Sequence, residues 1–126
     1  MSGASMPLAD RRALGAFGEQ SASTYLIGQR YTIADRNWRC NLGELDLVAT
    51  IGGQIVFIEV RTRQGDSSPL ESITPAKQRR LRALAYAYLT ATAQLAALWR
   101  IDVVGVNVDY HGRVTCIEHL EYAVGE

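Results

Sequence analysis

Residues 43–63 read GELDLVATIGGQIVFIEVRTR, two apolar runs separated by the Gly52-Gly53 pair. Runs of this kind predict strands, and a two-glycine connection predicts a tight β-hairpin because its turn requires positive φ angles. Glu44, Asp46 and Glu59 lie among the aliphatic residues of this stretch. Carboxylates beside a hydrophobic core are costly unless they are paired or bind something. The stretch therefore predicts the centre of the fold and, with it, a polar site.

The turn predicts the register of the hairpin. In a two-residue hairpin, pairing starts next to the turn, so Asp46 is expected opposite Glu59 and Glu44 opposite Arg61. Because side chains alternate between the two faces of a sheet, these four share one face. The opposite face is predicted to be core, formed by Leu45, Leu47, Ala49, Val56, Ile58 and Val60.

The opposed acids admit two interpretations. Carboxylates with Cβ atoms about 5 Å apart repel one another, and a divalent cation such as Mg²⁺ or Mn²⁺ would relieve that repulsion with water and phosphate as further ligands. Alternatively, the acids belong to a structural ion-pair network. The available partners for such a network are Arg39, Arg61, Arg63 and Arg100.

Sequence patterns elsewhere predict the remaining elements. A second helix is expected from Thr74 as N-cap and Pro75 at the first helical position. Its apolar stripe comprises Leu81, Leu84, Ala85, Tyr88 and Leu89. The other predicted elements are a helix over 10–27 ended by Gly28, a strand over 30–36, a loop over 64–73, and strands over 99–109 and 114–122. The order α-β-β-β-α-β-β predicts an α/β fold with a five-stranded mixed sheet flanked by helices.

Length and composition predict one globular domain. The chain has 126 residues, which we interpret as a single domain over 1–126 with residues 1–9 disordered. The formal net charge is zero, but residues 1–100 carry twelve of the thirteen basic residues. A basic patch is therefore compatible with the neutral total.

Two features predict a cytoplasmic protein. The N-terminus lacks an apolar run typical of a signal peptide, and Cys40 and Cys116 are isolated, as expected for free thiols in a reducing compartment. The uncharged run 83–99 is shorter than the roughly 20 residues of a membrane span. We interpret this run as part of a buried helix, and no membrane association is expected.

Four ordered blocks, GAFGEQSASTYL, RNWRCNLGELDLVA, VFIEVRTR and TPAKQRRLRALA, resemble the small bacterial YraN-like family. The spacing D-x(12)-E-x-[KR], formed by Asp46, Glu59 and Arg61, also resembles the PD-(D/E)xK nuclease superfamily. The YraN-like family is similar in fold to archaeal Holliday-junction resolvases. The resemblance implies a restriction-endonuclease-like fold and divalent-metal phosphodiester chemistry. By analogy with the resolvases, it also implies a homodimer.

The resemblance also implies roles for individual residues. Asp46 and Glu59 match the metal-binding carboxylates, and Glu19 matches the helical acid of the resolvase-type site. Glu19 follows Gly18, and a helical glycine costs about 1 kcal/mol relative to alanine unless the backbone must approach a neighbour closely. We therefore expect the first helix to bring Glu19 to the Asp46–Glu59 site.

Cations near the motif complete the predicted site. Arg61 stands where the superfamily most often has lysine, and arginine keeps its proton, so Arg61 is expected to stabilise charge rather than act as a base. Lys77, the only lysine, either supplies the missing ammonium group or lies at the helix start with its charge in solvent. Predicted nucleic-acid contacts are Arg36, Trp38, Arg39, Arg63, Lys77, Arg79 and Arg80. The alternatives are a packing role for Trp38 and an ordinary solvated helix face for the cations of the second helix.

These features lead to two hypotheses. The first is a Mg²⁺- or Mn²⁺-dependent endonuclease that cleaves DNA, branched or otherwise structured. The second is a non-catalytic module that keeps the fold and binds nucleic acid or a protein partner. The retained acids favour the first hypothesis, whereas Arg61 and the neutral net charge favour the second. His111 and His119 have no partner spacing and are assigned neither a catalytic nor a ligand role.

Overall fold

The computed structural model describes residues 11–65 and 73–125. The N-terminal residues that we expected to be disordered, and most of the predicted loop, lie outside these ranges. The elements follow the predicted order: α1 (Arg11–Gly28), β1 (Thr32–Cys40), β2 (Gly43–Ile51), β3 (Gln54–Gln64), α2 (Pro75–Ala91), β4 (Trp99–Val108) and β5 (Val114–Val124).

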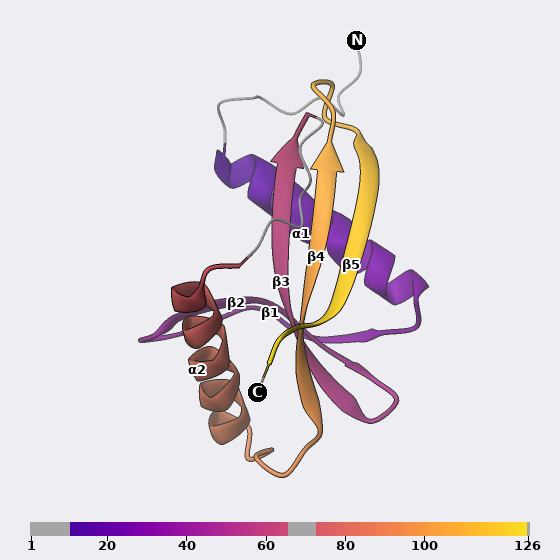
Figure 1. Cartoon of the computed structure of the whole chain (residues 1–126). Helices are drawn as coiled ribbons and strands as arrows, with labels where there is room; N and C mark the ends of the chain where they lie inside the picture. Colours follow the sequence, from indigo (N-terminus) through magenta and orange to yellow (C-terminus); the bar gives the residue numbers. More distant parts are fainter. Residues whose placement is uncertain (1–10, 66–72, 126) are drawn as a thin grey trace.

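The five strands form one mixed sheet in the order β1-β2-β3-β4-β5 (Figure 1). Neighbouring strands are antiparallel except β3 and β4, which are parallel and are connected through α2. This arrangement confirms the predicted α/β sheet flanked by helices. No helix within the described ranges is long and apolar enough to cross a membrane.

Each helix covers one face of the sheet. The cluster under α2 contains the predicted stripe of that helix together with Val48, Ile55 and Phe57. The cluster under α1 contains Ala22 and Leu26 of the helix and the alternate strand residues Leu47, Ala49, Val56 and Ile58. The hairpin therefore presents apolar side chains to both layers, and a polar site can form only where this packing ends.

The predicted hairpin register is confirmed near the turn. Ile51 pairs with Gln54, and pairing continues in step to Leu47 and Ile58. Gly52 and Gly53 have φ angles of 55° and 78°, as a tight two-residue turn requires.

Beyond the pair Leu47–Ile58 the paired ladder of β2 and β3 ends. Leu45 packs in the cluster under α2, whereas simple alternation placed it with Leu47 on the face of α1. The prediction that Leu45 belongs to the core is confirmed, since it is 2% exposed, and only the predicted face is wrong. Asn37 of β1, between the pairs Arg36–Leu47 and Trp38–Leu45, has a left-handed φ of 51°.

Two predicted boundaries also differ from the structure. Strand β1 extends to Cys40 rather than ending at residue 36, since it pairs with β2 along its whole length. Helix α2 ends at Ala91, within the apolar run 83–99 that we interpreted as buried helix. Leu95 and Leu98, beyond that end, are 60% and 74% exposed.

Gly18 brings α1 against the end of β3. It is buried, and a Cβ atom at this position would overlap the Thr62 hydroxyl and lie 2.9 Å from the Thr62 Cβ. We expect Gly18→Ala to lower the free energy of unfolding by about 1–3 kcal/mol because the helix must move away. Chemical denaturation of the metal-free protein measures this change.

Gly15 provides the matched control for this prediction. It lies in the same helix, and a Cβ atom there would meet nothing within 4 Å. Gly15→Ala is therefore expected to stabilise the protein by up to about 1 kcal/mol through helix propensity. Equal changes in the unfolding free energy of the two variants would show that the close contact between Gly18 and Thr62 does not restrict the residue at position 18.

Candidate active site

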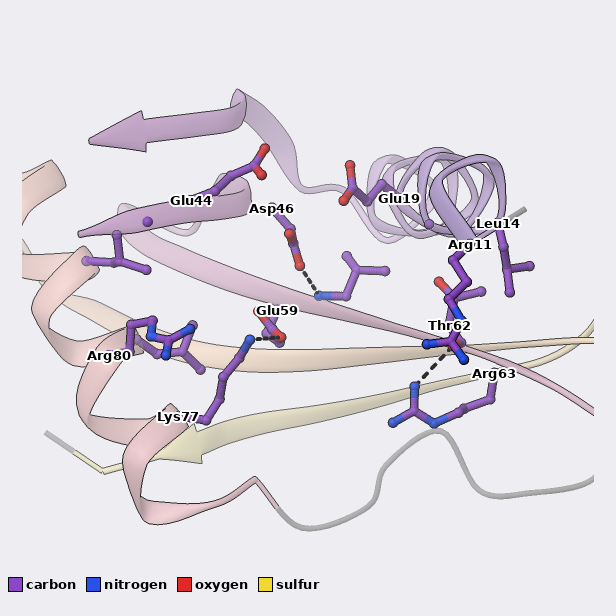
Figure 2. Close-up of a pocket in the computed structure, with 15 residues that line it drawn as sticks. Arg11, Leu14, Glu19, Glu44, Asp46, Glu59, Thr62, Arg63, Lys77 and Arg80 are labelled. Carbon is purple, nitrogen blue, oxygen red and sulfur yellow. Dashed lines mark hydrogen bonds and ion pairs between the residues drawn. The ribbon is translucent and has the colours of Figure 1, made fainter. Parts of the chain in front are cut away.

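A cavity of about 670 Å³ lies between α1 and α2, where β2 and β3 separate (Figure 2). Acidic and basic side chains from four elements line it. The acids are Glu19, Glu44, Asp46 and Glu59, and the bases are Arg11, Arg63, Lys77 and Arg80. The cavity thus combines the predicted carboxylates with a surrounding set of cations.

Asp46 is fixed by the backbone of the neighbouring strand. Its Oδ2 accepts a hydrogen bond of 2.8 Å from the Val60 N–H, just beyond the last paired residues of β2 and β3. The pKa of Asp46 is raised to about 8, mainly by burial and also by the negative charges of Glu59 and Glu19. The hydrogen bond from Val60 and the positive charge of Lys77 lower this pKa, but by less. The Asp46 carboxylate is therefore held in a place that disfavours its charge.

Glu59 is paired with the ammonium group of Lys77. The distance from Lys77 Nζ to Glu59 Oε2 is 3.1 Å, and the Glu59 side chain is only 14% exposed. The Thr74 cap begins α2 and accepts a hydrogen bond from the Lys77 N–H, which sets Lys77 in the first turn. Lys77 thus points into the cavity, as Figure 2 shows, rather than placing its charge in solvent.

Glu19 enters the cavity from α1, where the sequence predicted it. Its Oε1 accepts a hydrogen bond of 2.8 Å from Asn37 Nδ2 of β1. The close contact of Gly18 with Thr62 holds this part of the helix over β3. Asn37 was missed from the sequence, because no motif distinguishes this residue from other polar residues of an exposed strand.

Arg61 and Glu44 do not face one another as the ladder predicted. Arg61 lines a second cavity of about 350 Å³, which adjoins the N-terminus of α2 and shares Glu59 and Lys77 with the first. Glu44 forms its ion pair with Arg39, opposite it on β1, with 3.5 Å between Nε and Oε2. The predicted pairing fails because the β2–β3 ladder ends before these residues.

Comparison with known proteins identifies the family of the chain. The model of uncharacterised protein family UPF0102 matches residues 18–106, which include Glu19, Asp46, Glu59 and Lys77. The chain belongs to the UPF0102 family. The resemblance to the YraN-like family is thereby confirmed.

UPF0102 relatives match almost the whole chain. A UPF0102 protein of Chloroflexus aurantiacus is 54% identical over 122 residues, covering 96% of this chain and 99% of the relative. One of Roseiflexus castenholzii is 45% identical over 119 residues, covering 92% and 96%. Among solved structures, Pyrococcus furiosus SfsA in complex with Ca²⁺ matches 99% of this chain and 69% of its own, at 15% identity. Its TM-score of 0.42 is too low to support a conclusion about this chain.

The remaining predicted contact residues of this UPF0102 protein lie in different places. Trp38 is partly buried and packs edge-on against Tyr88, with ring centroids 5.3 Å apart, which agrees with a packing role, and its contact with nucleic acid stays a prediction. Arg36, Arg39 and Arg79 are exposed on β1 and α2 outside the lining of both cavities.

Arg63 and Arg80 line the main cavity, together with Arg11, which was missed from the sequence. Arg11, Gly15 and Glu19 recur every four residues of α1, a spacing that indicates one helix face. This spacing could have connected Arg11 with Glu19 before the structure was known.

The carboxylates of the UPF0102 site fit a divalent cation bound in part by water. Across residues 11–65 and 73–125, no group of three or more His, Cys, Asp or Glu side chains is arranged to hold a metal ion. Mg²⁺ typically uses one or two carboxylates and keeps several waters or phosphate oxygens. Asp46 and Glu59 offer such hard oxygen atoms, and burial of two like charges in one cavity favours the arrival of a cation.

Proposed function

We propose that this protein is a divalent-metal-dependent endonuclease that acts on DNA, branched or otherwise structured. The observation that carries the proposal is the placement of Asp46 and Glu59 in one cavity, where burial and mutual repulsion raise the Asp46 pKa to about 8. Repelling carboxylates destabilise a fold unless a ligand compensates them. A cavity that adds four basic side chains to these acids suits a metal ion together with a phosphodiester.

Asp46 and Glu59 would hold Mg²⁺ or Mn²⁺ in this proposal. Glu19 would contribute through the ion or through a bound water, because it does not form a three-acid group with the other two carboxylates. The ion, when bound, would supply Lewis-acid stabilisation of the phosphate and a more acidic water. The Val60 N–H keeps one Asp46 oxygen fixed, so the carboxylate is oriented before any ligand arrives.

The basic residues would bind and stabilise the phosphate. Among the described residues, Lys77 is the cation nearest to the Asp46–Glu59 pair, with its ammonium group 3.1 Å from Glu59. This group can turn from Glu59 to a phosphate oxygen. Arg11, Arg63 and Arg80 line the same cavity and can contact neighbouring phosphates. Arg61 would stabilise charge on the phosphate rather than accept a proton, because a guanidinium group does not act as a base in proteins.

The choice of a structured DNA substrate and of a homodimer rests on the resemblance to archaeal resolvases. Phosphate contacts position a nucleic acid without identifying its sequence. The basic lining of the cavity therefore supports a nucleic-acid backbone as the ligand. The preferred DNA structure is determined by comparing substrates.

A cleavage assay tests the proposal. Duplex, flap, single-stranded and four-way DNA would be incubated with the full chain and Mg²⁺, Mn²⁺ or chelator over a pH series, with Asp46→Ala as control. Metal-dependent products that disappear with Asp46→Ala would support the endonuclease. DNA binding without product under all these conditions would exclude it.

A second candidate is a nucleic-acid-binding or protein-partner module that does not cleave. The Lys77–Glu59 ion pair favours this candidate, because it already neutralises one of the two central acids. For such a module, Arg61→Ala would weaken binding, whereas neither metal nor Arg61→Lys would produce cleavage. For the endonuclease, Arg61→Lys should keep or raise activity, since it restores the more common motif residue.

Lys77 gives the sharpest test among the cations. We expect Lys77→Ala to reduce the cleavage rate by about 100-fold, because it removes the charge closest to the reacting phosphate. Arg79→Ala, two residues further along α2 and outside both cavities, removes the same charge and is the matched control. Cleavage rates are measured in single-turnover time courses. Equally small losses of rate in the two variants would show that Lys77 contributes only as one of several basic residues on the surface.

A further inference from the structure

Asn37 joins β1 to the acid of α1. Its side-chain amide donates a hydrogen bond of 2.8 Å to Glu19 Oε1, across 18 residues of sequence. Glu19 lines the cavity of Asp46 and Glu59, whereas Asn37 is exposed on β1. A contact at the edge of the site therefore holds one of the four acidic side chains that line the cavity.

The backbone of Asn37 is constrained as well as its side chain. Its φ of 51° lies in the left-handed region, which glycine and asparagine adopt more easily than other residues. This conformation occurs between the pairs Arg36–Leu47 and Trp38–Leu45 of β1 and β2. Asparagine meets two requirements here, since glycine would permit the backbone but could not donate the hydrogen bond.

Glu19 shares its cavity with the acids Asp46 and Glu59, so carboxylates of like charge lie near one another there and repel. The Glu19 side chain is only partly buried and could rotate toward solvent to escape this repulsion. The Asn37 amide opposes that rotation because it binds the carboxylate on the side of β1.

We infer that Asn37 is a positioning residue that holds the Glu19 carboxylate at the Asp46–Glu59 site and thereby sets the affinity of the site for a divalent cation. The inference rests on the proposed function, because it assumes that these acids bind a metal ion. Residues that orient metal-binding groups without touching the metal commonly change affinity by 10- to 100-fold when they are replaced. Asn37 itself would touch neither the ion nor the substrate.

Mn²⁺ binding to the full chain tests the inference by titration calorimetry. Asn37→Gly keeps the left-handed backbone and removes the amide, and we expect it to weaken Mn²⁺ binding by about 10-fold. Asn41→Gly, in the exposed turn between β1 and β2, is the matched control and should leave the affinity unchanged. Metal-free Asn37→Gly should unfold at the same denaturant concentration as the wild type, because glycine accepts the φ of this position.

A double-mutant cycle shows whether Asn37 acts through Glu19. In the Glu19→Ala background, Asn37→Gly should cause no further loss of Mn²⁺ affinity, because its partner is already absent. An equal loss in both backgrounds, or wild-type affinity in Asn37→Gly, would overturn the positioning role while leaving the metal site intact. Failure of the wild-type protein to bind Mn²⁺ would overturn the proposed function and this inference together.

Discussion

Asp46→Asn is expected to make the metal-free protein more stable at pH 8 and to abolish its stabilisation by Mn²⁺. Asparagine has nearly the same shape as aspartate, and its side-chain oxygen can keep the 2.8 Å hydrogen bond from the Val60 N–H. It removes the charge that burial and Glu59 disfavour. It also removes a proposed metal-binding oxygen, so the same substitution has opposite effects without and with the metal.

The pH dependence of the metal-free protein follows from the Asp46 pKa. The ordinary pKa of this carboxyl is 3.8 and its pKa in the folded protein is about 8, so between these pH values the folded state holds a proton that the unfolded state has lost. Folding is therefore favoured most below pH 4 by this group, and the contribution disappears as the pH rises through 8. We expect a loss on the order of 2–4 kcal/mol across this range in the wild type, and no such loss from residue 46 in Asp46→Asn.

Denaturant unfolding between pH 5 and 9, with chelator or with Mn²⁺, measures both effects. Glu44→Gln is the matched control, since Glu44 lines the same cavity but is more exposed and paired with Arg39. It should change stability by less than about 1 kcal/mol. Identical pH profiles for the wild type and Asp46→Asn with chelator would contradict the raised pKa. Equal stabilisation of the two proteins by Mn²⁺ would remove Asp46 from the metal site.

The central hairpin was predictable because its sequence leaves few alternatives. The turn fixed the register, and the apolar residues on both faces of β2 and β3 required a helix on each side. A register shift by one residue would move the side chains of one strand to the opposite faces, so that Val48 or Leu47 would lose its partners in the two clusters. The position of Glu19 was also predictable, since Gly18 indicated a close backbone approach that the structure contains at Thr62.

The end of the hairpin was not predictable from alternation. The β2–β3 ladder ends at the pair Leu47–Ile58, and Leu45, beyond it, packs under α2. In β1, Asn37 adopts a left-handed conformation opposite this part of β2. Glu44 pairs with Arg39 of β1 rather than with Arg61. Side-chain periodicity describes a regular, fully paired strand and does not indicate where the pairing ends.

His119 is a second case in which sequence spacing was insufficient. Its Nε2 lies 2.8 Å from Asp102 Oδ2, and its Nδ1 lies 3.2 Å from the Tyr25 hydroxyl. Asp102 also accepts hydrogen bonds from Arg100 Nε at 3.0 Å and from the Tyr122 N–H at 3.1 Å. The partners come from α1, β4 and β5, so only the folded sheet brings them together. We interpret this cluster as structural, because its polar groups satisfy one another away from the main cavity.

Asp102→Ala is expected to destabilise the protein by about 3–5 kcal/mol, since it leaves the buried charge of Arg100 without its main partner. Asp102 is fully buried and Arg100 is 8% exposed, so water cannot readily replace the lost carboxylate. Burial alone would raise the Asp102 pKa, but the hydrogen bonds from His119, Arg100 and the Tyr122 N–H hold that pKa below its ordinary value. The stabilisation by Asp102 is therefore present above pH 4 and is lost as the pH falls through the lowered pKa.

Denaturant unfolding at pH 7 and at acid pH distinguishes this network from an ordinary surface ion pair. Glu121→Ala is the control, because Glu121 lies 3.8 Å from the same guanidinium but is 56% exposed, and its loss should cost less than about 1 kcal/mol. The double variant Arg100→Met, Asp102→Leu should be more stable than Asp102→Ala, since it removes the unpaired charge together with its partner. Two results would contradict this explanation: equal losses of unfolding free energy in Asp102→Ala and Glu121→Ala, or a double variant that is the least stable of all. Either would show that Asp102 does not stabilise the protein by pairing with the buried charge of Arg100.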